Sequence, residues 1–246
     1  MPEARFRIRR YDPASDPPLR GGQRTDRWEE FTVPYESTLT VLEGLFFIQE
    51  KIDGSLSFRY CCRASICGSC AMYIQGKYRL ACQTNVRHFD GQVITVEPMP
   101  HMPLVKDLVC DMTSFFEKYE YVKPWLIRQS QDPEREIPQS PAERRLLDMP
   151  IDCILCGCCY SSCPSMWGED DYLGPAQLLW LYRFEADSRD EGGRERLAHF
   201  DNERGVYRCH TITNCIEACP KELSPTEAIQ WLKKAAVRRR LFGRRK

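Results

Sequence analysis

The sequence predicts an α+β protein in which a small mixed sheet comes first and a helical region follows. Strand-like segments separated by turn residues fill the chain up to Pro103, and segments with helical spacing follow it. Cysteines form one group in the first region and two runs in the second. With 246 residues the chain has room for two domains, and we place their boundary near residue 104, which gives domains 1–104 and 105–246.

The first region begins with two predicted strands. Residues 5–11 alternate in hydrophobicity, with Phe6 and Ile8 on one side, and residues 30–33 form a second strand-like segment. The Pro- and Gly-rich stretch 12–22 between them predicts a turn region.

A helix is predicted next, from Val41 to about Ile52. Thr40 and Glu43 have the spacing of a capping box, in which each side chain binds the backbone amide of the other residue. Apolar residues then recur along one face of the helix. Further strands are predicted over residues 71–74, 78–80 and 93–97, the first two joined by a short turn at Gln75-Gly76.

The second region carries helical patterns separated by a connector. Residues 104–119 have four apolar residues at helical spacing, Leu108, Met112, Phe115 and Phe116. A charged, Pro-rich connector occupies residues 131–141. Gly174-Pro175 opens a helix that continues to Phe184, and Ser224-Pro225-Thr226-Glu227 opens the last helix, with proline at its first position.

The cysteine group of the first region has the spacing of a plant-type 2Fe-2S site. The pattern C-x4-C-x2-C with a fourth cysteine downstream is met by Cys62, Cys67, Cys70 and Cys82. Four small residues lie between them, Ala64, Ser65, Gly68 and Ser69. Such residues let the backbone fold tightly round the metal and aim amide hydrogens at the sulfurs. The first region is therefore compatible with a β-grasp plant-type 2Fe-2S ferredoxin domain.

The two runs of the second region follow the bacterial ferredoxin pattern C-x2-C-x2-C-x3-C-P. The first run is complete, with Cys153, Cys156, Cys159 and Cys163-Pro164. The second run has Cys209, Cys215 and Cys219-Pro220, but Ile212 stands where its second ligand should be. A single C-x-x-C also fits a zinc site, a disulfide or buried thiols. Two full-length runs that both end in Cys-Pro favour iron-sulfur clusters over those alternatives.

In paired runs of this kind, the fourth cysteine of each run binds the cluster of the other run. The first cluster, a 4Fe-4S cluster, would take Cys153, Cys156, Cys159 and Cys219. The second would take Cys163, Cys209 and Cys215. Because the apolar Ile212 cannot hold an iron, we interpret this cluster as 3Fe-4S. The second region is thus predicted to be an all-α bacterial-ferredoxin-like domain with two cubane-type cluster sites.

These assignments use 11 of the 14 cysteines. For Cys61, Cys110 and Cys158 we expect buried thiols, because free cysteine behaves as a small hydrophobic residue. No apolar segment with a cleavage site marks export at the N-terminus, so these cysteines predict metal binding in a reducing compartment.

Composition limits the classes of partner. A formal net charge of +0 gives no general attraction to nucleic acid. No run of 18 apolar residues is present, so we expect no span of the membrane by this chain itself. Residues 233–246 carry eight Lys or Arg and no acid, which suits either contact with anionic lipid headgroups or a solvated helix end. No catalytic triad, Walker loop or dinucleotide fingerprint is present, so no catalytic residue is assigned and the clusters suggest an electron-transfer chain.

The sequence resembles the iron-sulfur subunits of succinate dehydrogenase and fumarate reductase along essentially its whole length. The cluster order is 2Fe-2S, 4Fe-4S, 3Fe-4S. Segments outside the cysteine patterns also support the resemblance: Ser57-Phe58-Arg59, Arg63, Asp107-Leu108-Val109, Asp111-Met112, Gly174-Pro175-Ala176, Asp187-Ser188-Arg189-Asp190 and Arg208-Cys209-His210.

The resemblance implies a peripheral subunit of a membrane complex, on the cytoplasmic face of the inner (plasma) membrane. Electrons would run from the FAD of a flavoprotein subunit, which oxidises succinate, through the three clusters to a quinone held partly by transmembrane anchor subunits. The positions that match the family's quinone contacts are Pro164, Ser165, Trp167, His210 and Ile212. Trp167 can donate its indole N–H to a quinone oxygen. His210 could take part in proton delivery, because an imidazole ordinarily titrates near neutral pH.

One departure concerns the quinone donor. Many succinate dehydrogenases have two consecutive tryptophans here, whereas this chain has Trp167 followed by Gly168. Packing of Trp167 against the anchor is therefore an alternative to quinone binding.

Three other functions remain open from the sequence. A fumarate reductase subunit would run the same electron chain in the opposite direction, although Arg208-Cys209-His210 resembles the dehydrogenase more. A soluble ferredoxin carrier is disfavoured by the chain length and by the family-like segments. The electron-transfer subunit of another complex, such as a heterodisulfide reductase or glycolate oxidase relative, would usually keep both cysteine runs complete, and Ile212 argues against it.

Overall fold

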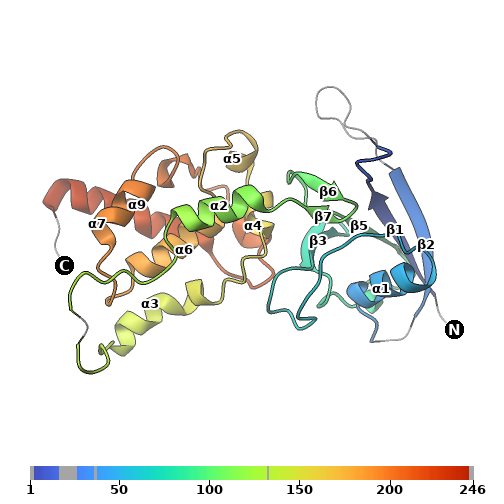
Figure 1. The fold of residues 1–246 in the computed structure, drawn as a ribbon, viewed down its shortest axis with the longest axis horizontal. Coiled ribbons are helices and arrows are strands. Elements are labelled where there is room, and N and C mark those ends of the chain that lie inside the picture. Colours follow the sequence, from blue (N-terminus) through green and yellow to red (C-terminus); the bar gives the residue numbers. More distant parts are fainter. Residues whose placement is uncertain (1–2, 17–26, 36–37, 132, 244–246) are drawn as a thin grey trace. The chain divides into compact units, whose positions relative to one another are not determined.

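The computed structural model describes residues 3–16, 27–35, 38–131 and 133–243, and these form two compact units (Figure 1). The first unit contains the chain up to Met112 together with Ile154–Ser161. The second contains Thr113–Cys153 and the chain from Ser162 onward. The division of the sequence at residue 104 stays a prediction, because the units of the structure interleave along the chain.

A five-stranded mixed sheet forms the centre of the first unit. Its strands are β1 (Glu3–Arg10), β2 (Arg27–Pro34), β3 (Ala71–Ile74), β4 (Lys77–Leu80) and β5 (Val93–Glu97), in the spatial order β2-β1-β5-β3-β4. β1 and β5 are parallel, and the other neighbours are antiparallel. All the predicted strands are present. Most of the predicted turn region 12–22 lies outside the described residues.

Helix α1 (Val41–Lys51) covers this sheet, as predicted, and begins with the predicted capping box. The amide of Glu43 donates to Thr40 Oγ1 at 3.2 Å, and the amide of Thr40 donates to Glu43 Oε2 at 2.8 Å. A Cβ placed on Gly44 would overlap the ring of Phe6, so the helix backbone rests directly on this side chain of β1. The sheet and helix form a β-grasp arrangement.

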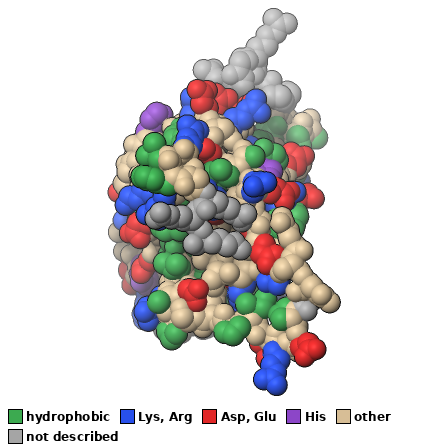
Figure 2. All heavy atoms as spheres, turned by 90° about the vertical axis from the view of Figure 1, so that its left-hand side faces the viewer, with side chains coloured by type: hydrophobic (Ala, Val, Ile, Leu, Met, Phe, Trp, Pro, Cys, Tyr) green, Lys and Arg blue, Asp and Glu red, His purple; other side chains and the backbone are tan. Residues whose placement is uncertain are grey.

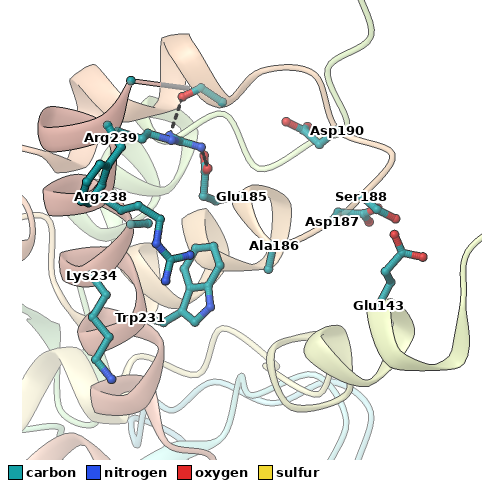
Figure 3. Close-up of a pocket in the computed structure, with 14 residues that line it drawn as sticks. Glu143, Glu185, Ala186, Asp187, Ser188, Asp190, Trp231, Lys234, Arg238 and Arg239 are labelled. Carbon is teal, nitrogen blue, oxygen red and sulfur yellow. Dashed lines mark hydrogen bonds and ion pairs between the residues drawn. The ribbon is translucent and has the colours of Figure 1, made fainter. Parts of the chain in front are cut away.

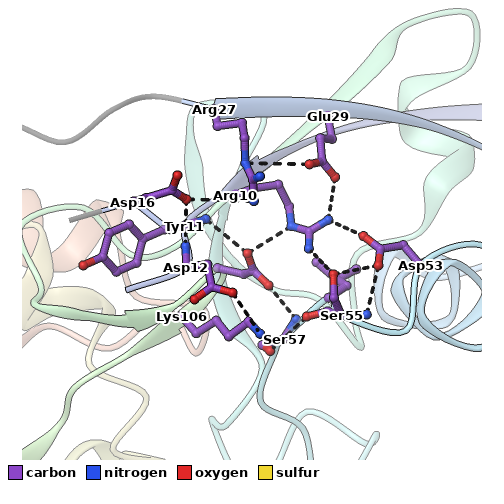
Figure 4. Close-up of polar contacts among 12 residues, drawn as sticks. Arg10, Tyr11, Asp12, Asp16, Arg27, Glu29, Asp53, Ser55, Ser57 and Lys106 are labelled. Atoms are coloured by element: carbon purple, nitrogen blue, oxygen red, sulfur yellow. Dashed lines mark hydrogen bonds and ion pairs between the residues drawn. The ribbon is translucent and has the colours of Figure 1, made fainter. Parts of the chain in front are cut away.

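A cluster of charged groups ties the N-terminal strand to later parts of the first unit (Figure 4). The buried Arg10 guanidinium donates to Asp107 Oδ1 at 3.0 Å and to Glu29 and Asp53 at 2.6 Å each. Ser55 accepts a further hydrogen bond from Arg10 at 2.8 Å. Charges removed from water need this degree of pairing, since an unpaired buried cation is costly.

The single helix predicted over residues 104–119 is wrong. The chain instead forms a hairpin of β6 (Leu104–Lys106) and β7 (Val109–Cys110), and only then helix α2 (Thr113–Tyr121). Asp107 causes the difference: it has a φ of 43°, and its carboxylate accepts from Arg10 and from the Ser57 amide. These contacts with distant parts of the chain override the local helical spacing.

The second unit is built on helices around α6 (Pro175–Glu185), which is buried on nearly every side. Its neighbours are α2, α3 (Pro141–Ile151), α7 (Gly193–Phe200) and α9 (Pro225–Phe242). α6 and α9 begin where the sequence predicts. Helix α3 is not among the predicted elements, although Ser140 and Glu143 form a capping box that marks its start.

The surface of the helical unit is mixed in charge. On the face drawn in Figure 2, Lys and Arg side chains are interspersed with Asp and Glu side chains. Within the described residues, no helix is long and apolar enough to cross a membrane.

Candidate functional site

Three cysteines of the first group, Cys62, Cys67 and Cys70, lie on a tightly wound loop that precedes β3, and the fourth, Cys82, follows β4. Positive φ angles at Arg63 (54°), Ser65 (61°) and Gly68 (73°) wind this loop between Cys62 and Cys70. Left-handed conformations are costly for residues with a Cβ, so several in one short loop indicate a backbone shaped for a purpose.

This winding turns backbone amides toward sulfur. Cys62 Sγ accepts hydrogen bonds from the amides of Ala64, Ile66 and Cys67, each at 3.3 Å. Cys67 Sγ accepts one from the amide of Cys62 at 3.4 Å. The amide donors expected from the sequence are therefore present. Such bonds stabilise thiolates and tune the potential of a cluster that they hold.

Electrostatic interactions show that the other cysteines of this group are close together. Burial, with the thiols of Cys82 and Cys67 beside it, raises the pKa of Cys70 to about 12. Burial also acts on Cys67, but hydrogen bonds from Ser69 and from the Cys62 amide outweigh it and lower the pKa of Cys67 to about 6. The thiols of the loop before β3 and of Cys82 after β4 thus lie near one another, as a 2Fe-2S cluster requires.

Cys156 and Cys159 lie on the segment Ile154–Ser161, which belongs to the first unit. Positive φ angles at Leu155 (53°) and Gly157 (81°) turn the chain on either side of Cys156. A hydrogen bond from the buried Cys158 thiol lowers the pKa of Cys156. These features favour a thiolate at Cys156.

The remaining predicted ligands of this 4Fe-4S cluster lie in the second unit. Cys153 follows the C-cap residue of α3, Asp152, and its amide donates to Pro150 O at 3.3 Å. Cys219 follows the short helix α8 (Asn214–Glu217), with its amide bonded to Ile216 O at 3.1 Å. The four-thiolate set stays a prediction, since its members are divided between the two units.

The third predicted set lies entirely within the second unit, around one small pocket. Cys163, Cys209 and Cys215 all line it, and so does Ile212. Burial raises the pKa of Cys163 and of Cys215, and the thiols of the three cysteines interact electrostatically. Three thiols and an isoleucine at one cavity match the donor set of a 3Fe-4S cluster.

Two residues of α9 support this pocket and were not predicted from the sequence. Thr226 Oγ1 lies 3.2 Å from Cys215 Sγ, and Lys233 Nζ donates to the carbonyl of Cys209 at 2.8 Å. Ile229 lines the same pocket. The spacing of these three residues places them on one helix face, but no signal in the sequence shows that this face meets the cysteines.

Four of the five predicted quinone contacts line this pocket. They are Pro164, Ser165, His210 and Ile212, whereas Trp167 is not among the lining residues. Trp167 ends the short helix α5 (Pro164–Trp167), which begins directly after Cys163. Trp167 is 46% exposed and Ile212 49% exposed, and His210 is also exposed. Thr211 and Thr213, with φ angles of 60° and 71°, turn the chain on both sides of Ile212.

The cysteines without a predicted ligand role behave differently from one another. Cys110 and Cys158 are buried, as expected, but Cys61 is exposed, so its predicted burial is wrong. Cys61 directly precedes Cys62, whose Sγ faces the backbone amides of the loop before β3. Among the described residues, no three His, Cys, Asp or Glu side chains converge as ligands of a single metal ion. The thiolates of a cluster are shared among two or more irons, so all of them need not converge on one point.

A larger hollow of about 750 Å³ lies elsewhere in the second unit, between α9 and the turn after α6 (Figure 3). Two of its carboxylates have arginine partners: Glu185 pairs with Arg239, and Asp187 accepts from Arg189 at 2.9 Å. Burial raises the pKa of Glu185. No cysteine is among the described residues that line this hollow, so it is separate from the cluster sites.

Family models match both parts of the chain. A 2Fe-2S iron-sulfur cluster binding domain matches residues 5–117, and a 4Fe-4S dicluster domain matches residues 145–220. Among solved structures, a chain of the Mycobacterium smegmatis Sdh1 complex in the apo form superposes with a TM-score of 0.84 at 23% identity, over 96% of each chain. This likeness confirms the fold.

Curated relatives identify the family. A succinate dehydrogenase iron-sulfur subunit of Paracoccus denitrificans is 43% identical over 237 residues, which is 96% of this chain and 88% of that protein. The mitochondrial succinate dehydrogenase [ubiquinone] iron-sulfur subunit 1 of Oryza sativa subsp. japonica is 49% identical over 197 residues, which is 79% of this chain and 70% of that protein. Neither relative favours the fumarate reductase alternative. The chain therefore belongs to the iron-sulfur subunits of succinate dehydrogenase and serves that enzyme in electron transfer.

Proposed function

We propose that this subunit carries a 3Fe-4S cluster beside its 2Fe-2S and 4Fe-4S clusters, and delivers electrons from a partner's FAD to a membrane quinone. The observation that carries this proposal is the pocket that Cys163, Cys209 and Cys215 share with Ile212. Three thiolates can hold three irons, and an isoleucine side chain offers no ligand for a fourth. Each cluster, when bound, accepts and releases one electron at a time.

The protein's own part is to hold and tune these clusters. Amides of the loop after Cys62 direct hydrogen bonds at its sulfur, which favours the thiolate. At the third set, the Thr226 hydroxyl contacts Cys215 Sγ and Lys233 fixes the backbone of Cys209. Burial of Cys215 and of Ile229 keeps water away from the inner side of that pocket.

The flavoprotein would dock at the loop of the first cysteine group. Ile66, inside this loop, is 67% exposed, and Tyr60 and Cys61 beside it are also exposed. The Arg63 guanidinium stacks over the rings of Phe46 and Tyr60, with its Cζ at 4.6 Å and 5.5 Å from the ring centroids. An exposed apolar residue, here Ile66, with aromatic and cationic side chains nearby suits a protein interface beside a redox centre.

The quinone and the anchor subunits would contact the face around the third set. Trp167, His210 and Ile212 are exposed there, and an indole N–H can donate to a quinone oxygen. Large apolar side chains exposed together mark contact with a partner or a membrane. We therefore infer a peripheral location at the cytoplasmic face of the inner (plasma) membrane, through transmembrane anchor partners.

Electron paramagnetic resonance on anaerobic membranes that contain the assembled complex tests this proposal. The oxidised sample should show a 3Fe-4S signal, which should fade on addition of succinate while a 2Fe-2S signal appears. An oxidised sample without a 3Fe-4S signal, at full iron content, would contradict the role given to Ile212. Clusters that do not respond to succinate would instead contradict the electron source.

A further inference from the structure

The loops of the first and second cysteine groups are in direct contact at Gly68. A Cβ placed on Gly68 would lie 2.8 Å from the carbonyl oxygen of Ile154 and 2.9 Å from the Cα of Cys156. Real Cβ atoms essentially never come closer than 3.0 Å to such atoms. Both loops belong to the first unit. The contact is therefore backbone against backbone, with no room for a side chain.

The contact lies between proposed ligands of two different clusters. Gly68 directly follows Cys67, a proposed ligand of the 2Fe-2S cluster, and it faces Cys156, a proposed ligand of the 4Fe-4S cluster. Its φ of 73° would by itself favour glycine. The close approach to Cys156 is a second and independent requirement, because it excludes any side chain at all.

We propose that Gly68 is a positioning residue that sets the separation across which an electron passes from the 2Fe-2S to the 4Fe-4S cluster. In this step the reduced 2Fe-2S cluster loses one electron and the oxidised 4Fe-4S cluster gains it. No bond forms or breaks and no proton moves. Electron tunnelling weakens steeply with distance, so a methyl group that forces the loops apart slows the transfer. This inference rests on the cluster ligands proposed above.

The test compares two glycine-to-alanine variants in the assembled complex. Gly68→Ala introduces both backbone strain and the clash with the loop of Cys156. Gly91→Ala is the matched control, because Gly91 has a φ of 75° but nothing within 4 Å of an added Cβ. Both are purified with wild type, assayed for iron and sulfide, and reduced with dithionite until both clusters hold an unpaired electron.

The readout is the microwave power at which the 2Fe-2S signal saturates. A nearby reduced 4Fe-4S cluster speeds the spin relaxation of the 2Fe-2S cluster, and this effect falls steeply with distance. We expect Gly68→Ala to keep the 2Fe-2S line shape and iron content but to saturate at lower power than wild type, with slower quinone reduction. Gly91→Ala should match wild type. Equal saturation in all three proteins, with relaxation enhancement intact, would overturn the role of Gly68.

Two further outcomes are informative. If reduction of the 4Fe-4S cluster leaves the 2Fe-2S relaxation of wild type unchanged, the cluster assignment itself is wrong and the inference falls with it. If Gly68→Ala loses its 2Fe-2S cluster, Leu155→Gly is added, because the φ of 53° at Leu155 lets a glycine there relax the opposing loop. Recovery of the cluster in the double variant supports the contact, and continued loss overturns it.

Discussion

Arg10 and Asp107 form a buried ion pair between residues 97 positions apart in the sequence. Nε of Arg10 lies 3.0 Å from Oδ1 of Asp107, and the two side chains are 3% and 0% exposed. The pair joins the last residue of β1 to the turn between β6 and β7. Because the Asp107 carboxylate also accepts from the Ser57 amide, it holds the segment that leads toward the first cysteine group.

Replacement of this arginine should be costly. We expect Arg10→Met to lower the free energy of unfolding by about 3–5 kcal/mol, since it leaves a buried carboxylate without its cation. The neighbouring Arg9→Met is the control, because Arg9 makes a partly exposed pair with Glu97 at 3.5 Å and should cost about 1 kcal/mol or less. Urea unfolding followed by circular dichroism measures both. Equal losses would show that the buried pair contributes nothing particular.

Local signals in the sequence predict much of the first unit. The capping box of Thr40 and Glu43 fixes the start of α1, and the turn at Gln75-Gly76 joins β3 to β4 with φ angles of 49° and 70°. Positive φ at both turn residues matches the twist of a hairpin. In contrast, the helical spacing over residues 104–119 is overridden by Asp107, whose partners are distant in the sequence.

In the candidate site, too, the sequence predicts local patterns but not the contacts that depend on packing. Cysteine spacing predicts which thiols belong together, and the structure gathers Cys163, Cys209 and Cys215 at one pocket. Spacing does not predict Thr226 or Lys233, because their contacts with this set depend on how α9 packs. The hydrophobicity of a cysteine side chain likewise does not predict that Cys61 is exposed, because its exposure depends on how the loop folds.

The first cysteine group provides a specific test of the ligand assignment. We expect Cys67→Ser to abolish or strongly weaken the 2Fe-2S signal and to leave the signals of the other two clusters intact. Cys61→Ser is the matched control, since Cys61 is an exposed cysteine close to the same loop and should leave all signals unchanged. Paramagnetic resonance with iron analysis measures both variants. Loss of the 3Fe-4S signal in Cys67→Ser would contradict the assignment of the cysteines to separate sites.

The isoleucine of the third set makes the opposite test possible, because a ligand can be added. Ile212→Cys should let a fourth iron bind, lower the potential of that cluster and slow quinone reduction. Ile212→Val offers no ligand and should keep the 3Fe-4S signal and nearly normal turnover. Redox titration of the paramagnetic signals distinguishes the two variants. An unchanged spectrum in Ile212→Cys, with the cysteine shown to be present, would contradict the ligand set.

The tryptophan after the third set is the proposed quinone donor. Trp167→Phe keeps an aromatic ring but removes the indole N–H, so we expect the KM for quinone to rise about three- to tenfold, the worth of one neutral hydrogen bond. Reduction of an artificial acceptor that bypasses the quinone should not change. Trp125→Phe, at another exposed tryptophan, is the control. If Trp167→Phe instead loosens the anchor while KM stays constant, the residue packs against the anchor.

The turn after α6 should make stability depend on pH. Burial alone would raise the pKa of Asp187, but hydrogen bonds from Arg189 and Arg183 outweigh it and lower the pKa from 3.8 to about 2. A carboxylate with a lowered pKa in the folded state stabilises fully above its unfolded pKa, and this stabilisation is lost as the pH falls from about 4 toward 2. For the fully buried side chain of Asp187, a shift of this size corresponds to about 2 kcal/mol.

Comparison with Asp187→Asn isolates this contribution. The difference in unfolding free energy between wild type and variant should be constant above about pH 5 and should shrink by about 2 kcal/mol as the pH approaches 2. Asp148→Asn is the control, because Asp148 pairs with Arg144 on the exposed side of α3 and its replacement should change stability little. Urea unfolding at matched iron content measures all three proteins. A difference for Asp187→Asn that does not vary with pH would show that Arg183 and Arg189 do not lower the pKa of this carboxylate.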